Sequence, residues 1–273
     1  MRNPVAPDPR TESAFERRAA RADALARVSV AAAEPLRFAA GLYRVQGRLA
    51  AAIEALHAGH PLSGRLRDDA GRFADRLGEV LRFAADQGPP GLAAEAEARA
   101  REEASLVHSR LLVWWSGDRP SEEDYLSRAL LRPYGEVLAA LGVSPDRPHR
   151  RGHCPFCGGA PWVASRREDA DAAGARRMLG CALCGGEWPL GRILCPCCGE
   201  GDPVKLPSFQ SDSYPAARIE ACETCRRYVK SIDLTVDGRA IPEVDDLLSL
   251  SMDLWAAGEG FVRIEPGLAG ELS

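Results

Sequence analysis

Cysteines are the residues of this sequence whose type and spacing most clearly indicate chemistry. The chain contains nine of them, all between positions 154 and 225. Eight fall into four CxxC units, made of Cys154, Cys157, Cys181, Cys184, Cys195, Cys198, Cys222 and Cys225. Two intervening residues allow a tight turn to direct both sulfurs at one ion, and two such turns complete a tetrahedral four-thiolate site for Zn²⁺ or iron. The pattern predicts two metal sites with these eight thiolates as ligands.

The four units also form an internal repeat. Twenty-three residues separate the first unit from the second and the third from the fourth, so the first four cysteines map onto the second four by adding 41. This favours consecutive grouping, with 154/157/181/184 in one module (about 154–190) and 195/198/222/225 in the other (about 195–231). Interleaved grouping, first unit with third and second with fourth, stays open because connectivity does not follow from spacing alone.

The residue that follows each CxxC unit affects the geometry of its turn. In CPFCG, CALCG and CPCCG this residue is Gly, which permits the left-handed backbone that lets amides point back at the thiolates. In CETCR it is Arg226, for which the same conformation costs about 1 kcal/mol. We therefore expect the fourth turn to be less regular.

Cys197, the ninth cysteine, lies outside the repeat. It occupies the position held by Phe156 and Leu183 in the first two turns, so the favoured interpretation is a small apolar filler. The alternative is a reactive thiol or a substitute ligand beside the ion. His153 could compete as a ligand, but four thiolates leave it no vacancy. No arrangement of His, Ser or Asp resembles a catalytic constellation, so we do not expect an enzyme.

The first half of the chain is predicted to be a helical domain. Residues 1–148 contain no cysteine and are rich in Ala, Arg, Leu and Glu. Apolar residues recur at helical spacing over 38–56 and again over 66–84, before the breaker GPPG. A third helix should end at LLVWWSG. A fourth should begin at Ser121, where SEED resembles a capping box, and Pro133 should break or restart it.

The second half is predicted to hold the metal region over 149–231, with short strands at APWVASRR, ARIEAC and YVKSIDLTV. A strand-helix-strand tail over 232–273 should pack on that region. The expected fold class is α+β: an N-terminal all-helical domain, then a tandem rubredoxin-like or zinc-ribbon-like four-cysteine metal domain with a C-terminal helix.

The C-terminal helix is expected to begin at Pro242 and to end at Gly258. Its predicted packing face consists of Val244, Leu247, Leu248, Ser251, Leu254 and Trp255. The acidic residues of the same segment, Asp245, Asp246 and Asp253, are expected to lie in solvent.

Composition limits the classes of protein to which this chain can belong. No run of 18 uncharged apolar residues occurs among the 273, and the first 18 residues contain no apolar stretch, so we expect a cytoplasmic protein without membrane association. In that reducing compartment, clustered cysteines indicate metal binding before disulfides. The net charge of −4 disfavours nucleic acid as a partner. A zinc-ribbon nucleic-acid binder stays an alternative, and its basic patch would be Arg226, Arg227 and Lys230.

Several segments together resemble a known family. CPFCGGAP, RRMLGCALCGGEW, LCPCCGE, RIEACETCRRYVK and VDDLLSLSMDLWAAGEGFVR occur in this order, and EPLRFAAGLY lies at 34–43. They are similar to the formate dehydrogenase accessory protein FdhE family over nearly all of 145–264, and more patchily before it. The resemblance implies a cytoplasmic, rubredoxin-like iron-binding protein, with iron in two four-thiolate sites and zinc as the alternative ion. It also implies a chaperone-like accessory role in assembly of respiratory formate dehydrogenase and binding of that enzyme's catalytic subunit. A rubredoxin-type electron carrier acting during maturation of the partner is the alternative function.

Overall fold

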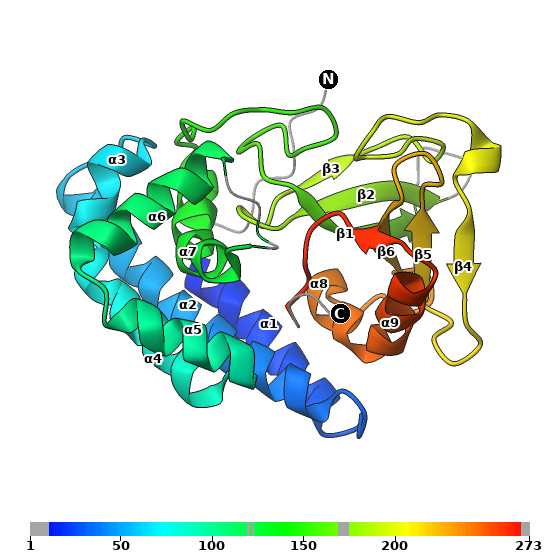
Figure 1. The fold of residues 1–273 in the computed structure, drawn as a ribbon, viewed down its shortest axis with the longest axis horizontal. Helices are drawn as coiled ribbons and strands as arrows, with labels where there is room; N and C mark the ends of the chain where they lie inside the picture. Colours follow the sequence, from blue (N-terminus) through cyan, green and yellow to red (C-terminus); the bar gives the residue numbers. More distant parts are fainter. Residues whose placement is uncertain (1–10, 119–120, 122, 169–174, 269–273) are drawn as a thin grey trace.

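The structure, a computed structural model, describes residues 11–118, 121, 123–168 and 175–268. Helices form one side of the molecule, and a mixed sheet with the C-terminal helices forms the other (Figure 1). The expected α+β class is therefore confirmed, since a helical region precedes a sheet that carries both four-cysteine groups. Within the described ranges, no helix is long and apolar enough to cross a membrane.

Seven α-helices lie in the described part of the N-terminal region: α1 (Thr11–Ala26), α2 (Ala33–Gly59), α3 (Leu66–Asp69), α4 (Leu77–Gln87), α5 (Pro90–Ala100), α6 (Ala104–Ser116) and α7 (Tyr125–Leu141). The first apolar stripe is confirmed, because Leu42, Val45, Leu49 and Ile53 of α2 are buried. The predicted end at LLVWWSG is also confirmed. Helix α6 ends at Ser116, and Gly117 follows it in the left-handed conformation with φ 80°.

The second apolar stripe does not form one helix. Two 3₁₀ turns, η1 (Ala70–Arg72) and η2 (Ala74–Arg76), separate α3 from α4. Asp69, the last residue of α3, has a buried carboxylate that accepts hydrogen bonds from the amides of Ser63 and Gly64 and from the Tyr134 hydroxyl at 2.6 Å. These bonds fix the end of α3 to the preceding loop and to α7, and the turns begin at the next residue.

Helix α7 begins four residues later than predicted. Its N-cap is Asp124, whose carboxylate accepts from the Ser127 amide at 2.9 Å and from Arg99 at 2.8 Å. The hydroxyl of Ser121 instead accepts a hydrogen bond from the Trp114 indole at 3.3 Å. The prediction of a cap at Ser121 was wrong because the Asp124 carboxylate meets both the helix amide and a buried guanidinium.

Pro133 does not break α7, which continues to Leu141. Proline has no amide hydrogen, so the carbonyl of Ala129, four residues earlier, lacks its helical donor. The buried side chain of Gln46, on α2, donates Nε2–H to this carbonyl at 2.8 Å. A neighbouring helix thus replaces the missing bond, and the predicted break was wrong because nothing near Pro133 in the sequence reveals that donor.

Replacing Gln46 with Met is expected to lower the free energy of unfolding by about 1 kcal/mol, because the Ala129 carbonyl loses this donor. Urea unfolding measures the change. The matched control is the Pro133→Ala background, where residue 133 regains an amide that can bond Ala129. There the Gln46 substitution should have a clearly smaller effect, and equal effects in both backgrounds would contradict this account.

Seven strands form one mixed sheet in the described chain: β1 (Pro161–Glu168), β2 (Ala175–Cys181), β3 (Glu187–Pro189), β4 (Ser208–Gln210), β5 (Ala217–Ala221), β6 (Arg227–Asp233) and β7 (Val262–Arg263). The order is β3-β2-β1-β6-β5-β4, with β7 beside β6. The three predicted strands are present as β1, β5 and β6, although β6 ends at Asp233, before the end of the predicted segment YVKSIDLTV.

The sheet follows the 41-residue repeat. Strands β1, β2 and β3 form one antiparallel unit, and β4, β5 and β6 form the second. The two units are joined by a parallel pairing of β1 with β6, where Val163 lies opposite Lys230. The duplicated cysteine pattern therefore corresponds to duplicated three-stranded units placed side by side in one sheet.

The C-terminal segment contains α8 (Pro242–Asp245), the 3₁₀ turn η4 (Asp246–Ser249) and α9 (Leu250–Gly258), which lie against β5 and β6 (Figure 1). Its predicted faces were partly wrong. Leu254 and Trp255, expected to pack, are 54% and 41% exposed. The three acids expected in solvent are buried, namely Asp245, Asp246 and Asp253. The tighter η4 turn has three residues per turn, so the helical periodicity assumed in the prediction does not continue through it.

A buried lysine explains why two of these acidic side chains are buried. Lys230 of β6 is fully buried, and its Nζ lies 3.2 Å from Asp246 Oδ1 and contacts the Asp253 carboxylate. Arg263 of β7 also bonds Asp246, at 2.8 Å, and Asp253, at 3.2 Å. Burial opposes ionisation of Asp246, but the charges of Arg263 and Lys230 outweigh it and lower the pKa of that carboxyl. Two cations and two anions thus balance one another between the sheet and α9.

Lys230→Met is expected to lower the free energy of unfolding by about 3–5 kcal/mol, because it leaves two buried carboxylates with one cation. Thermal and urea unfolding measure the loss. The control is Arg239→Met, whose side chain is 88% exposed and pairs with Asp237 at the surface. This control should change stability by less than about 0.5 kcal/mol, and a similarly small effect of the Lys230 substitution would refute the balanced network.

A second buried network joins the helical region to the rest of the chain. Glu136 of α7 accepts from Arg132 at 2.7 Å and from Arg18 of α1 at 2.8 Å. Both arginines also contact Glu243 of α8. The Arg132 guanidinium lies 4.6 Å from the ring centre of Trp162, on β1. Elements α1, α7, α8 and β1 therefore meet around two arginines and two glutamates that form four ion pairs.

Candidate metal centres

The structure brings the eight predicted cysteines together in two groups of four. The first group is Cys154, Cys157, Cys181 and Cys184, and the second is Cys195, Cys198, Cys222 and Cys225. One unit of each group precedes the strands of its module; the other begins at the last residue of β2 in the first module and directly after β5 in the second. The grouping is consecutive, so the interleaved alternative does not hold.

The sulfur positions fit a tetrahedral ion. In the first group, Cys154 Sγ lies 3.7 Å from Cys184 Sγ, and Cys157 Sγ lies 3.4 Å from Cys181 Sγ. In the second group both corresponding separations are 3.7 Å. A disulfide needs about 2.05 Å, whereas a metal with bonds of about 2.3 Å to four sulfurs spaces them about 3.8 Å apart. The donor set and its spacing suit Zn²⁺ or iron.

Backbone amides surround the first group in the way that thiolate ligands require. The amide of Gly159 donates to Cys157 Sγ at 3.4 Å, and the amide of Leu183 donates to Cys181 Sγ at 3.4 Å. Such bonds orient the sulfurs and stabilise their negative charge. The CxxC turns therefore bring the sulfurs together and also place backbone amide donors beside them.

All four turns adopt one conformation, including the turn that the sequence predicts to be less regular. Gly158, Gly185 and Gly199 have φ of 68°, 67° and 78°, and Arg226 has φ 56°. The amide of Arg226 donates to the Cys222 carbonyl at 2.9 Å, as the amide of Gly199 does to Cys195 at 3.0 Å. The expectation of an irregular fourth turn was wrong.

Contacts of the Arg226 side chain account for this left-handed residue. Its guanidinium carbon lies 3.8 Å from the ring centre of Phe261 and its nitrogens bond the Glu259 carbonyl and the Glu223 carboxylate. Stacking of a guanidinium on an aromatic ring contributes about 0.5–1 kcal/mol at exposed sites, which is similar to the strain of the left-handed backbone. A glycine at this position would lack the compensating contact.

The two groups differ in exposure and in their neighbours. All members of the first are buried, whereas Cys198 is exposed and Cys225 is partly exposed in the second. The first module packs on α7 so closely that a Cβ added to Gly135 would lie 2.9 Å from the Leu183 side chain. Burial raises the pKa of the Cys195 thiol to about 11, so binding of an ion there must release a proton at neutral pH.

Arg147 is a residue near the first group that the sequence did not single out. Its guanidinium carbon lies 4.9 Å and 4.8 Å from the ring centres of Trp114 and Trp115. Burial lowers the pKa of this guanidinium, and Cys157 and Cys181 as thiolates oppose that effect. Four thiolates around a divalent ion would carry a net charge of −2, which the Arg147 guanidinium would partly offset. In the sequence, only the adjacent pair Trp114 and Trp115 hints at such a stacked cation. Its proximity to residue 147 becomes apparent only in the folded chain.

The remaining sequence predictions near the metal region have mixed outcomes. Cys197 is exposed and belongs to neither four-cysteine group of the described chain. The Nδ1 atom of His153 lies 3.0 Å from the Gly158 carbonyl oxygen. The basic patch suggested for nucleic acid does not form as one surface, because Lys230 is fully buried against acids and Arg226 is stacked and ion-paired.

Fold and site together define a class of protein in which a helical region is joined to two tandem four-cysteine modules within one sheet. A family model described as "FdhE, C-terminal domain" matches residues 193–268. The chain resembles the crystal structure of the FdhE protein from Pseudomonas aeruginosa with a TM-score of 0.71 and 25% identity, over 98% of both chains. The chain is thus similar to FdhE proteins in the sequence of its C-terminal part and in its whole fold.

Two curated relatives show how far the sequence similarity extends. The FdhE homolog of Aquifex aeolicus is 37% identical over 151 residues, which are 54% of this chain and 53% of that protein. The FdhE homolog of Rhizobium meliloti is 29% identical over 284 residues, 94% of this chain and 90% of the relative. The match thus spans about half of the first relative and most of the second.

Cys154→Ser and Cys222→Ser are each expected to lower the metal content from two ions per chain to one, because each removes one of four thiolates. The Cys154 variant should lose more stability, since its group is buried beneath α7. Metal analysis and thermal unfolding of the purified variants measure both effects. Cys197→Ser is the matched control and should retain two ions. Loss of an ion in this control would show that the ligand set is wrong.

Proposed function

We propose that this protein is an accessory factor for the assembly of formate dehydrogenase and not itself a catalyst. The observation that carries the proposal is similarity to an FdhE structure along 98% of both chains, which includes the helical region as well as the two four-cysteine modules. Similarity to FdhE proteins supports a role in maturation of that enzyme. The same similarity supports a cytoplasmic site of action.

We further propose that all eight paired cysteines bind metal, one ion to each group of four. Iron is the proposed native ion because of the family resemblance, and zinc fits the same donors. Bound iron can change its oxidation state, whereas zinc cannot. The proposed role of the ions is structural: they hold the CxxC turns, and with them the ends of β2 and β5, in fixed positions.

The catalytic subunit of formate dehydrogenase is the proposed partner. Buried charge networks fix the helical region against the sheet, so a partner meets one preformed surface that includes both parts of the chain. Rigid surfaces bind with less loss of conformational entropy than flexible ones. This supports recognition of a folded or nearly folded subunit.

An electron carrier that acts during maturation is the second candidate, and the exposure of the second group favours it. Cys198 is exposed, and Cys225 is partly exposed. An ion at this group would lie close to the protein surface, where a redox partner can approach. The fully buried first group shows no such access.

Zinc-substituted protein separates the two functions, because zinc preserves tetrahedral geometry without redox chemistry. We expect this protein to bind the catalytic subunit with an affinity within about threefold of the iron form, and to restore formate oxidation in cells that lack the native factor. Co-purification and activity staining measure the two effects.

The control is the Cys154→Ser variant, in which both effects should weaken. Binding by zinc protein without recovery of formate oxidation would reject the structural role in favour of electron transfer. Absence of binding in both metal forms would reject the assembly function.

A further inference from the structure

The face of the sheet opposite α9 carries a cavity of about 240 Å³ that no part of the proposed function uses. Neighbouring residues of a strand point to opposite faces. Because Lys230 meets α9, Ser231 points away from it, and Arg218 of β5 lies directly opposite Ser231. Arg166 of β1 and Arg177 of β2 are paired on the same far face. The residues that cover this face of the sheet belong to the segment between β3 and β4.

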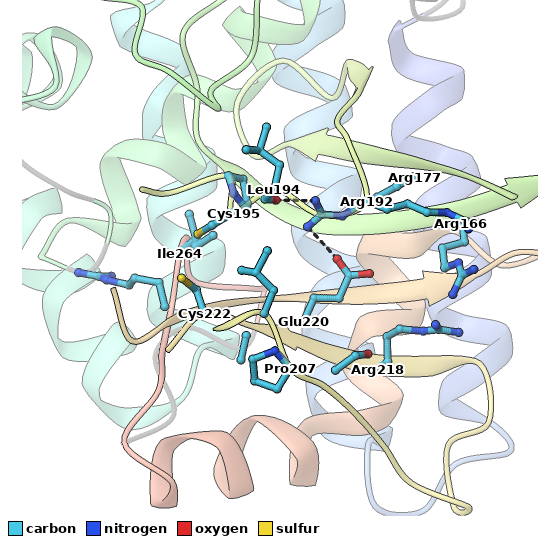
Figure 2. Close-up of a pocket in the computed structure, with 15 residues that line it drawn as sticks. Arg166, Arg177, Arg192, Leu194, Cys195, Pro207, Arg218, Glu220, Cys222 and Ile264 are labelled. Atoms are coloured by element: carbon cyan, nitrogen blue, oxygen red, sulfur yellow. Dashed lines mark hydrogen bonds and ion pairs between the residues drawn. The ribbon is translucent and has the colours of Figure 1, made fainter. Parts of the chain in front are cut away.

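Arginine side chains dominate the cavity wall. Arg166, Arg177, Arg192 and Arg218 all line it, with Glu220 among them. Figure 2 shows Arg166 and Arg218 at one end of the cavity, and the sulfur atoms of Cys195 and Cys222 at the other. The cavity thus lies between the outer part of the sheet and the second four-cysteine module.

Ion pairs balance only part of the positive charge of this wall. Glu220 pairs with Arg177 at 2.7 Å, and Asp233 pairs with Arg218 at 3.0 Å. Among the residues that the structure describes, Arg166 and Arg192 have no carboxylate partner, and Arg192 donates to the Ala175 carbonyl at 2.6 Å. Arg166 and Arg192 therefore line the cavity without an ion pair of their own in the described chain; Asp233, opposite Arg166 on β6, acts on its charge from a distance, and Cys195 and Cys222 lie at the far end.

Two buried donors in the wall also lack acceptors. The Nε atoms of Arg177 and Arg218 are inaccessible to solvent and have no hydrogen-bond partner in the described structure. Arg177 is only 6% exposed. An unsatisfied buried donor is destabilising by about 1–3 kcal/mol. Burial and the neighbouring charge of Arg166 lower the pKa of Arg218, in keeping with an excess of positive charge.

We propose that this cavity binds the phosphate or diphosphate group of a small molecule. Two guanidinium groups without an ion pair favour a compact dianion, and the planar guanidinium fork matches phosphate oxygens. A single carboxylate supplies only one negative charge. The cavity is smaller than the roughly 300–1,000 Å³ of pockets for drug-sized ligands, which favours a small anionic group over a peptide segment. This inference is independent of the proposed assembly role.

Calorimetric titration of metal-loaded, full-length protein with sodium pyrophosphate at constant ionic strength tests the proposal. Wild-type protein should bind one pyrophosphate per chain. Arg166→Gln should weaken binding at least tenfold, because it removes a charge-assisted contact without leaving a carboxylate unpaired. The matched control is Arg167→Gln, the next residue of β1, whose side chain pairs with Glu187 and does not line the cavity. Its affinity should equal that of the wild type.

Thermal unfolding without ligand provides a second readout. Arg166→Gln should melt at the same temperature as the wild type or higher, because repulsion within the cavity is relieved. A markedly lower melting temperature would show that Arg166 stabilises the fold and would overturn the proposal, as would equal weakening of binding in the two variants. Absence of pyrophosphate and orthophosphate binding by the wild type would overturn it too.

Further titrations distinguish the sources of the anion. Orthophosphate tests a free phosphate ion, and ADP tests a diphosphate group carried by a larger molecule; Arg166-dependent binding of either supports the site. Equal affinity for acetate, or binding of a glutamate-rich peptide without any phosphate binding, would overturn the proposal in favour of carboxylate recognition.

Discussion

The fold depends on a group of charged side chains that lose contact with solvent together, where α7 meets both α1 and α8. Arg132 and Glu136 are buried there, Arg18 and Glu243 are nearly so, and the four share their bonds, so removal of any one leaves an uncompensated charge. Burial opposes ionisation of Glu243, yet Arg132 and Arg18 outweigh it and lower the pKa of that carboxyl. Because buried ion pairs add little stability over apolar packing, the main effect of the network is to permit only one arrangement of these elements.

Helix α7 also contacts the metal region and fixes its position. Gly135 allows the first CxxC module to approach the helix closely, and Arg132 stacks on Trp162 at the start of the sheet. Arg128, one turn earlier, bonds Glu265 at 2.7 Å and so holds the end of the described chain. The Pro133 interruption lies among these contacts, and Gln46 compensates for it from α2. One helix therefore positions the first four-cysteine group and the segment that follows β7.

Local patterns predicted those features whose causes are local. The CxxC spacing and its repeat predicted which cysteines meet, and the apolar stripe of α2 predicted its buried face. The errors arose where a distant partner decides the outcome. The left-handed Arg226 depends on Phe261, and the burial of Asp246 and Asp253 depends on Lys230. An acidic residue on a short helix normally faces solvent, and only the sheet register reveals a buried lysine beneath it.

The shared network at α7 also has a consequence for the order of folding during synthesis. Glu243 lies more than one hundred residues after Arg132, so a ribosome completes α1, α7 and the first cysteine module before it makes α8. Until α8 emerges, Arg18 and Arg132 have only the carboxylate of Glu136 as a partner in this network. The network that fixes the helical region against the sheet is therefore complete only after nearly all of the protein has been made.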